Sequence, residues 1–473
     1  MFLKSTGARP GLTLAAGAVV QFMVSLDLSV VNVGLPQIAS GLGFSAVNLA
    51  WVIHAYALTF GGLLLLGGKA SDRYGRQRML LLGLALFGLA SLAGGFAQSP
   101  GQLIAARAVQ GVGAATLAPA ALALLTATFP SGRERVRAFG IWSATNAAGG
   151  AIGVLIGGLL TQYVSWRAVM FVNAPMVAIA VLMVARIHDS RAAQPGSRPD
   201  VLGGLLATAG MTTLVFGVVR TDRHPWSSAT TLLTIAAAVV LLAGFVSVEH
   251  TTRREPLLRL GLLANRSVSG ANGFNLLVGA AMASAFYFMS LYLQEVLRHG
   301  PAVSGVMFLP FALAVVAGSF LAIKLGYRFA TRDLLVGGAL LAAAGFGWFS
   351  LISVDGSFLV NILGPSILVG GGFGLCLAPL VSTATGGVAP EEAGTASGLL
   401  NSSRQIGASL GLAALGTVAH DRTGDLETVG ALNDGYALAL RLCAVLLLVG
   451  VVIVLAVLRR TPPRPAAPVS ESA

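Results

Sequence analysis

The sequence predicts an all-α integral membrane protein that crosses the bilayer fourteen times. Charged residues make up only 10% of the 473 residues, hydrophobic residues make up 55%, and the mean hydropathy is +0.82. A soluble domain would carry roughly a quarter charged residues. Apolar runs recur along the chain, each long enough to cross a hydrocarbon core of about 30 Å as a helix. Because backbone groups in lipid must bond within their own segment, these runs are predicted as helices.

The apolar runs are separated by short polar loops. We predict spans near residues 12–36, 48–68, 79–97, 103–127, 138–162, 168–186, 201–219, 230–248, 268–292, 304–323, 333–352, 358–380, 394–416 and 436–458.

The basic residues support this count and give an orientation. If the N-terminus is cytoplasmic, 22 of the 30 Lys and Arg residues fall in cytoplasmic segments, five fall outside and three fall within spans. This is the positive-inside pattern of a multi-pass protein. The first apolar run is too long for a cleaved signal peptide. We therefore expect a protein of the cell inner (cytoplasmic) membrane with both termini in the cytoplasm.

Composition also argues against other classes. The net charge of +12 does not indicate nucleic-acid binding, because the basic residues recur in short loops rather than in one patch. Cys376 and Cys443 lie inside apolar runs, so a disulfide framework is not expected. No constellation typical of catalysis or metal binding is present in the sequence. We expect no enzyme activity, no cofactor and no metal.

An internal repeat suggests two halves. The fourth predicted span contains G-V-G-A-A-T-L-A-P, ending at Pro119, and the twelfth contains G-G-F-G-L-C-L-A-P, ending at Pro379. Parallel repeats are a known plan of transporters, with the binding site at their interface. The predicted division is an N-terminal six-helix bundle (1–186), a cytoplasmic linker (187–200), two inserted helices (201–248), a second linker (249–267), a C-terminal six-helix bundle (268–458) and a disordered cytoplasmic tail (459–473).

Several motifs resemble those of a known family. The turn after the second span carries the pattern G-x-x-x-D-R-x-G-R at Gly68, Asp72, Arg73, Gly75 and Arg76. The first span reads L-D-L-S-V-V-N-V-G-L-P from Leu26 to Pro36. The fourth span opens with R-x-x-Q-G-x-G at Arg107, Gln110, Gly111 and Gly113. Together these motifs resemble the major facilitator superfamily, and within it the fourteen-span drug:proton antiporter family.

The resemblance implies the major facilitator fold, with two six-helix bundles plus two inserted central helices. It also implies a monomer that exports small amphipathic compounds (drugs, antibiotics or metabolites) in exchange for protons by alternating access, surrounded by membrane lipids. One motif departs from the family pattern. The fifth span of the family reads G-P-x-x-G-G, and here Val154 replaces the proline between Gly153 and Gly157. The glycines still favour close helix packing.

Three ionisable residues share the outer half of the predicted N-terminal bundle. Asp27 is the only acidic residue deep within a span, and such residues mark ion or substrate pathways. Arg107 and His54 lie at similar depth in spans four and two. We predict that Asp27 takes up the coupling proton, that Arg107 tunes its proton affinity and that His54 serves as a relay. The alternatives are a fixed ion pair between two helices and a histidine that bonds a neighbour.

Other polar groups on spans are candidates for substrate binding. Arg404 lies in the middle of its span and must face a cavity or a partner. It either binds a polar part of the substrate or holds helices together. The predicted substrate-binding residues are Arg404, Asn32, Asn146, Asn275, Tyr287 and Asn401. Aromatic residues on spans, Phe286 among them, are candidates for an apolar pocket.

The motif turn is the predicted gate. The resemblance implies that Asp72, in the set Gly68, Asp72, Arg73, Gly75 and Arg76, pairs across helices in one state and loosens in the other. Gly75 permits a tight turn. The alternative is a basic loop that only sets topology, but that role needs no aspartate.

The prediction for function is a proton-coupled secondary transporter that exports small molecules. The alternatives are a sensor or lipid-handling protein of the same fold without proton coupling, and a proton symporter for uptake.

Overall fold

The computed structural model describes residues 10–129, 132–187, 200–222, 224, 226–251, 256–259, 261–326, 328–386, 388, 392–424 and 428–460. The predicted tail at 459–473 and the linker at 187–200 lie almost wholly outside these residues.

The described elements are helices. The first half contains α1 (Pro10–Leu42), α2 (Ala46–Leu49), α3 (Trp51–Tyr74), α4 (Arg76–Gly95), α5 (Pro100–Thr128), α6 (Gly132–Tyr163), α7 (Trp166–Phe171) and α8 (Asn173–Val184). The middle contains α9 (Val201–Val219), η1 (Arg220–Asp222) and α10 (Ala229–Thr251). The second half contains α11 (Gly261–Ala264), α12 (Arg266–Leu291), η2 (Tyr292–Val296), α13 (Pro301–Met307), α14 (Leu309–Leu325), α15 (Thr331–Phe349), η3 (Phe358–Leu363), α16 (Gly364–Thr385), α17 (Ala393–Thr423) and α18 (Val429–Val457).

Length and hydropathy support most of the predicted spans. Within the described residues, thirteen helical segments are long and apolar enough to cross a membrane. The predicted span at 394–416 is observed as the 31-residue helix α17, but α17 is not among the thirteen. Its middle is polar, with Ser402, Ser403 and Gln405 buried against other helices. Hydropathy therefore indicates a multi-pass membrane protein. The total of fourteen membrane spans stays a prediction.

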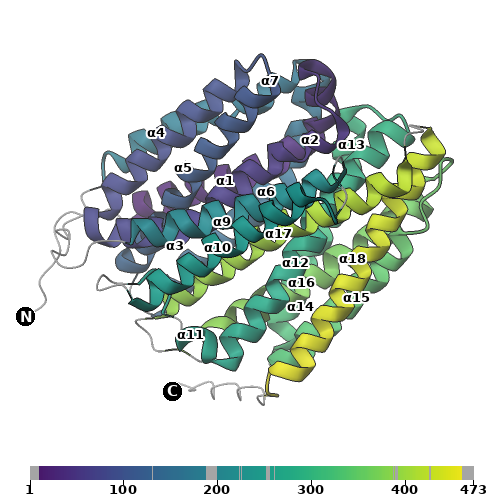
Figure 1. Ribbon diagram of the computed structural model, residues 1–473. Helices are drawn as coiled ribbons and strands as arrows, with labels where there is room; N and C mark the ends of the chain where they lie inside the picture. The colour runs from purple at the N-terminus through teal and green to yellow at the C-terminus, as the bar shows by residue number, and fades with distance from the viewer. Residues whose placement is uncertain are drawn as a thin grey trace, which may run out of the picture.

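The two halves repeat one packing pattern (Figure 1). In the first half, α5 packs between α3 and α4, and α1 packs against α6. In the second half, α16 packs between α14 and α15, and α12 packs against α17. Pro119 lies inside α5 and Pro379 inside α16, so the two A-P motifs occupy helices with matching neighbours.

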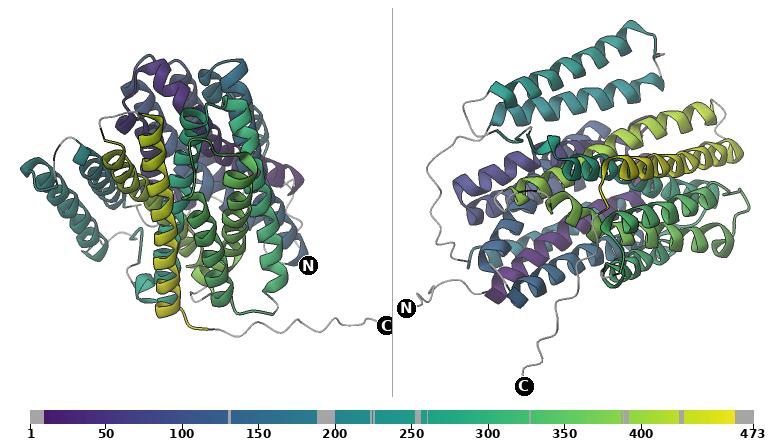
Figure 2. Two further views of the ribbon diagram at one scale, coloured as in Figure 1. Left: turned by 90° about the vertical axis from the view of Figure 1, so that its right-hand side faces the viewer. Right: turned by 90° about the horizontal axis from the view of Figure 1, so that it is seen from below.

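Helices α9 and α10 form a hairpin at the edge of the molecule, as both views in Figure 2 show. Helix α9 contacts α3 of the first bundle and α17 of the second, whereas α10 packs mainly on α9. The inserted pair therefore covers one side of the seam between the bundles and does not lie between them.

Helix α6 is wedged between two neighbours by small residues. A Cβ on Gly153 would lie 2.8 Å from the carbonyl oxygen of Leu26, and one on Gly157 would lie 2.6 Å from that of Val30. On another face, the carbonyl of Val154 lies 2.8 Å from the Cβ position of Gly305 on α13. The close packing expected from the glycines is thus present, and Val154 takes part in a contact between the bundles.

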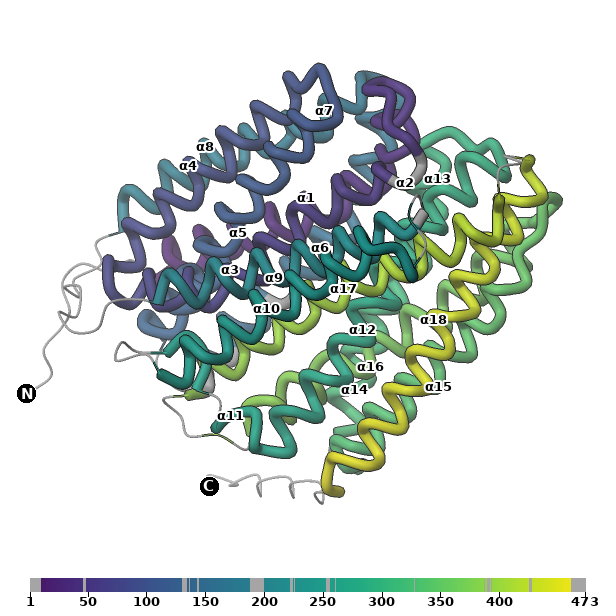
Figure 3. The backbone as a smooth tube through the Cα atoms, in the orientation of Figure 1, coloured from purple at the N-terminus to yellow at the C-terminus, as the bar shows by residue number. Residues whose placement is uncertain are grey.

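Three polar contacts between the bundles lie toward one end. Gln37 donates to Gln294 at 3.0 Å, Ser290 donates to the carbonyl of Asn32 at 2.8 Å, and the N–H of Ala302 donates to Gln162 at 2.9 Å. The start of α1, the α3–α4 turn and the end of α18 lie at the opposite end (Figure 3). The positive-inside pattern predicts that this opposite end is cytoplasmic. Ser402 of α17 also donates to the carbonyl of Gly61, in the middle of α3, at 2.8 Å. The bundles are thus bonded at the predicted outer end and again between α3 and α17.

Gly157→Val should destabilise the protein, because the new side chain would overlap the backbone of α1. Overpacking of this kind costs about 1–3 kcal/mol or more. The matched control is Gly140→Val on the same helix, where nothing lies within 4 Å of the Cβ position. Thermal unfolding of the purified variants in detergent checks this, and equal midpoints for the two variants would contradict it.

Candidate functional site

Asp27 lies in a fully buried polar cluster inside the first bundle. Its Oδ2 accepts from Nη1 of Arg107 at 2.7 Å. Its Oδ1 accepts from Nε2 of Gln110 at 2.7 Å and from Nδ2 of Asn173 at 2.8 Å. Asp27 and Arg107 are 0% and 2% exposed. The sequence places the two residues at similar depth, and the structure brings their side chains into contact.

Arg107 has partners besides the carboxylate. Its Nε donates to the carbonyl of Val52 at 3.2 Å, and Nη1 also donates to Oε1 of Gln110 at 2.8 Å. Its guanidinium carbon lies 4.4 Å from the centre of the Tyr56 ring. A buried guanidinium needs such partners, because an unpaired charge in the interior is very unfavourable. These contacts tie Arg107 of α5 to α3 independently of Asp27.

Besides α1, the cluster draws on four helices: α3, α4, α5 and α8. Arg107 and Gln110 are three residues apart on α5 and so share a face. Ser91 on α4 accepts from Asn173 at 3.0 Å and donates to the carbonyl of Met170 at 2.7 Å. Sequence reasoning did not assign Gln110, Asn173 or Ser91 to the site. The available signals were the place of Gln110 in the R-x-x-Q-G-x-G motif and the polar side chains of Asn173 and Ser91 in or next to an apolar run.

His54 lies elsewhere. It is fully buried, and neither ring nitrogen has a hydrogen-bond partner among the described residues. It lines a cavity of about 100 Å³ between the bundles, together with Tyr287, His420 and Tyr436. His54 therefore lies at this cavity, whereas Asp27 lies in the cluster with Arg107, Gln110 and Asn173. The hydroxyl of Tyr436 donates to Glu295 at 2.7 Å.

The candidate substrate residues of the second half differ in burial and in their hydrogen-bond partners. Arg404 is partly buried and donates to Asn401 of the same helix at 3.3 Å. Asn275 is 3% exposed and donates to the carbonyl of Leu400 and to Ser403, which ties α12 to α17.

Two candidates lie in the first half. Asn146 on α6 accepts from Gln21 at 2.6 Å. Nδ2 of Asn32 donates to the carbonyl of Leu28 at 2.7 Å, and Oδ1 of Asn32 has no hydrogen-bond partner among the described residues.

The motif turn joins α3 to α4. Gly75 has φ +96°, a conformation that side-chain-bearing residues rarely adopt. Asp72 and Arg73 lie in the last turn of α3, and Arg76 begins α4. A Cβ on Gly68 would lie 3.6 Å from the Cβ of Pro119 on α5. Gln77 donates to the carbonyl of Val184 at 3.0 Å, which holds the turn against α8.

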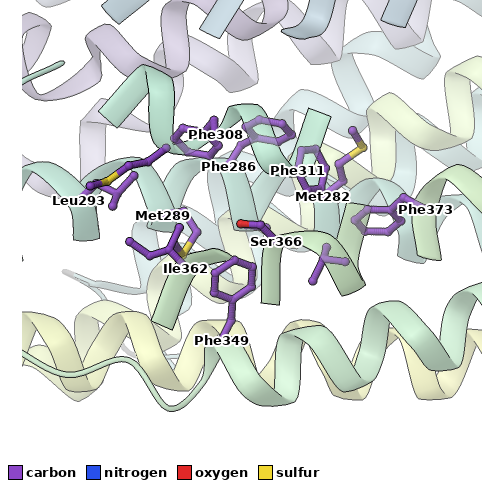
Figure 4. Close-up of a pocket in the computed structure, with 13 residues that line it drawn as sticks. Met282, Phe286, Met289, Leu293, Phe308, Phe311, Phe349, Ile362, Ser366 and Phe373 are labelled. Carbon is purple, nitrogen blue, oxygen red and sulfur yellow. The ribbon is translucent and has the colours of Figure 1, made fainter. Parts of the chain in front are cut away.

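An aromatic pocket lies within the second bundle (Figure 4). Phe286 stacks on Phe308 with ring centres 5.4 Å apart and meets Phe311 edge-on at 5.1 Å. The void is about 20 Å³, little more than one water needs. Met282, Met289 and Met307 also line it. Methionine side chains are flexible and adapt to irregular shapes. The sequence suggested Phe286 for an apolar pocket but not the methionines.

No group of three or more His, Cys, Asp or Glu residues able to hold a metal occurs in the described part of the chain. The buried ion pair, the two repeated bundles and the apolar pocket are features of a membrane transporter that moves a small molecule through its centre.

Comparison with known proteins identifies the family. A sequence profile of the Major Facilitator Superfamily matches residues 17–412. The chain is 40% identical over 466 residues to the cephamycin export protein CmcT of Amycolatopsis lactamdurans, covering 97% of this chain and 95% of that protein. It is 39% identical over 450 residues to the puromycin resistance protein pur8 of Streptomyces alboniger, covering 93% and 88%. The chain therefore belongs to the Major Facilitator Superfamily, whose members are transporters and not enzymes.

Solved structures agree with the fold. A crystal structure of a mutant of the nucleoside transporter NupG matches with a TM-score of 0.68 at 12% identity, covering 95% of this chain and 100% of that one. An inward-facing bacterial homologue of the human lysosomal transporter Spinster matches with a TM-score of 0.64 at 17% identity, covering 94% and 95%. At these identities the matches show the fold alone.

The Asp27–Arg107 pair should behave as one unit in unfolding. Asp27→Asn leaves a buried guanidinium short of its counter-charge, which costs about 3–5 kcal/mol. The double variant Asp27→Asn with Arg107→Gln should recover part of this loss, because neither charge then remains. Unfolding midpoints in detergent measure the coupling.

The surface pair Arg460–Asp333 serves as the control for this cycle. Its side chains are 72% and 32% exposed, and exposed pairs contribute only about 0–1 kcal/mol. If the losses at Asp27 and Arg107 simply added, the two residues would not be coupled and the interpretation would fail.

Proposed function

We propose that this chain exports small amphipathic compounds, such as antibiotics, in exchange for protons by alternating access. The observation that carries the proposal is the buried Asp27–Arg107 pair in a chain that is 40% identical over 97% of its length to a cephamycin exporter. Relatives named for resistance to puromycin and lincomycin point to the same class of substrate.

Asp27 is proposed as the proton carrier. Each of its two oxygens accepts at least one hydrogen bond from another helix. A proton on the carboxyl would displace one donor and remove the charge that holds Arg107. Arg107 would keep its bonds to Val52 and Gln110 on α3 and α5, so protonation would loosen α1 from that pair of helices. Uptake of the proton is thereby linked to movement of a helix that joins the bundles at the predicted outer end.

The bonds at the predicted outer end support a proposed order of conformational states in the transport cycle. In this structure the bundles are bonded near Gln37 and Gln294, and Asp27 is sealed and paired. Opening of the outer end would expose Asp27 to external protons and release the drug. Loss of the proton would restore the pair with Arg107 and favour the state described here.

The Asp72 turn is proposed to gate the cytoplasmic end, with Gly68, Arg73, Gly75 and Arg76 shaping it.

The proposed substrate path has an apolar part and a polar part. The apolar part is the pocket of phenylalanines and methionines around Phe286, which must open by side-chain movement to admit a ligand. The polar part comprises Arg404, Asn401, Asn146, Asn32 and Tyr287. Asn275 would reach substrate only by exchanging its bonds to α17. A path of this mixed character suits amphipathic compounds.

We propose the following architecture in the membrane. The protein is a monomer in the inner membrane, in contact with lipids, with fourteen spans and both termini in the cytoplasm. The N-terminal bundle covers 1–186, the inserted pair 201–248 and the C-terminal bundle 268–458. Helix α17 is the thirteenth span in chain order and completes the fourteen, shielded from lipid by its packing on α3, α9, α12 and α18.

Asp27→Asn should abolish proton-driven transport, because the amide cannot take up and release a proton. Inverted membrane vesicles with an imposed proton gradient should accumulate a panel of antibiotics, and accumulation should fall at least about tenfold in the variant. Asp333→Asn, a surface carboxylate outside the cluster, is the matched control.

The outcomes of this assay separate the alternatives. Full gradient-driven accumulation by Asp27→Asn would remove Asp27 from the mechanism. Accumulation only with the gradient reversed would indicate uptake by symport. No accumulation of any compound by the unaltered protein, with or without a gradient, would favour the sensor or lipid-handling function.

His54→Gln should change the pH profile of transport near neutrality if the histidine relays protons, since histidine is the side chain that normally titrates there. Glutamine fills similar space and can still hydrogen-bond. The measurement is the rate of accumulation in vesicles against pH, with Gln405→Asn as a control on the neighbouring helix α17. An unchanged profile for His54→Gln would assign His54 to the lining of the cavity only.

A further inference from the structure

Two buried carboxylates meet where the inserted hairpin begins and ends. Asp200 precedes α9 and is 1% exposed, and its Oδ1 accepts the N–H of Gly203 at 3.0 Å. Glu249 lies near the end of α10 and is 6% exposed, and its Oε2 accepts the N–H of Leu258 at 3.1 Å. Each carboxylate thus uses one oxygen to fix the local backbone.

The other oxygen of each carboxylate lies close to Gly203. Oδ2 of Asp200 and Oε1 of Glu249 have no hydrogen-bond partner among the described residues. Both lie 2.9 Å from the position that a Cβ on Gly203 would take. The two oxygens are therefore no more than twice that distance apart, in a space that exists because residue 203 has no side chain.

Two buried carboxylates this close do not readily ionise together. Burial disfavours the charge on each group, and the charge on one disfavours the charge on the other. A proton on one oxygen removes one charge and provides a donor for the other oxygen.

Lys69 lies on the face of α3 that packs against the inserted hairpin. Gly62, Leu66 and Lys69 share one face of α3, and that face packs on α9, with Gly62 against Thr208 and Leu66 against Gly204. The charge of Lys69 acts on the Glu249 carboxylate. Arg259, the charged residue of the segment 256–259 beside Glu249, is 70% exposed and pairs with Glu392 instead.

We propose that Asp200 and Glu249 form a second proton-binding site, in which Oδ2 and Oε1 share one proton. With the proton bound, the pair carries a single negative charge opposite Lys69. Without it, the pair carries two, and the pull on Lys69 increases. Lys69 lies between Gly68 and Asp72, so the protonation state of the inserted hairpin acts on the turn between α3 and α4. This site is separate from Asp27 and does not depend on the identity of the substrate.

Infrared spectroscopy of the purified full-length protein in a detergent without ester groups tests this directly. At neutral pH the unaltered protein should show the carbonyl band of a protonated carboxylic acid. The band should lose the intensity of one carboxyl in Glu249→Gln and in Asp200→Asn. Both variants keep the local backbone bonds, because an amide oxygen can still cap α9 or accept from Leu258. Asp333→Asn, which alters an exposed carboxylate, should leave the band unchanged.

Thermal unfolding gives a second readout. The folded pair holds a proton that carboxyls in the unfolded chain release, so the unfolding midpoint of the unaltered protein should fall as the pH rises above the ordinary carboxyl range of about 4. Glu249→Gln mimics the protonated pair, because the new amide can donate to Asp200. This variant should show a flatter curve with a higher midpoint at the alkaline end. Asp333→Asn should follow the unaltered protein.

Three results would overturn the proposal. The first is the absence of the carboxylic acid band from the unaltered protein, and the second is a band that both variants retain in full. The third is a rise in the midpoint with sodium chloride, but not with choline chloride at equal ionic strength, that disappears in Glu249→Gln. That result would assign the site to a metal cation.

Discussion

The first bundle is organised around one buried ion pair. Asp27 on α1 and Arg107 on α5 meet at 2.7 Å, and Gln110 and Asn173 satisfy the other carboxylate oxygen. A charge pair out of water is stable only when its remaining hydrogen-bonding groups are also satisfied. This requirement fixes the rotation of α1, α5 and α8 about their own axes, and with it the face that α1 turns toward α6. The geometry of the bundle and its proposed chemistry therefore depend on the same contact.

Small residues let the helices around that pair come into close contact. Gly153 and Gly157 bring α6 against the backbone of α1, while the carbonyl of Val154 meets Gly305 on α13. Within a bilayer, association between helices relies on such close packing, because lipid is as apolar as leucine. The proline of the family motif is absent here, yet α6 still bridges the two bundles. The contact rests on the glycines of α6 and on Gly305 of α13.

The apolar runs were sufficient to predict the helices, because a span must be long and apolar whatever its neighbours are. Contacts between helices were less accessible, since they depend on how each helix is rotated. Asp27, Arg107 and His54 have similar depth in the sequence, but only the first two meet, and His54 faces the cavity with Tyr287. Gln110 belongs to the R-x-x-Q-G-x-G motif, but the motif does not tell which partner its side chain meets. Asn173 and Ser91 were missed because the sequence does not show which way their helices face. The place of α9 and α10 at the edge was likewise not contained in their order along the chain.

The polar character of α17 has a consequence for biogenesis. An arginine at the centre of a helix disfavours insertion through the translocon by about 2.5–3.5 kcal/mol, and α17 carries Arg404 among serine, asparagine and glutamine. Its partners α3, α9 and α12 precede it in the chain, so they have already left the ribosome when α17 emerges. Entry of this helix into the bilayer is then an act of assembly on a preformed protein surface, and not partitioning of a lone segment into lipid.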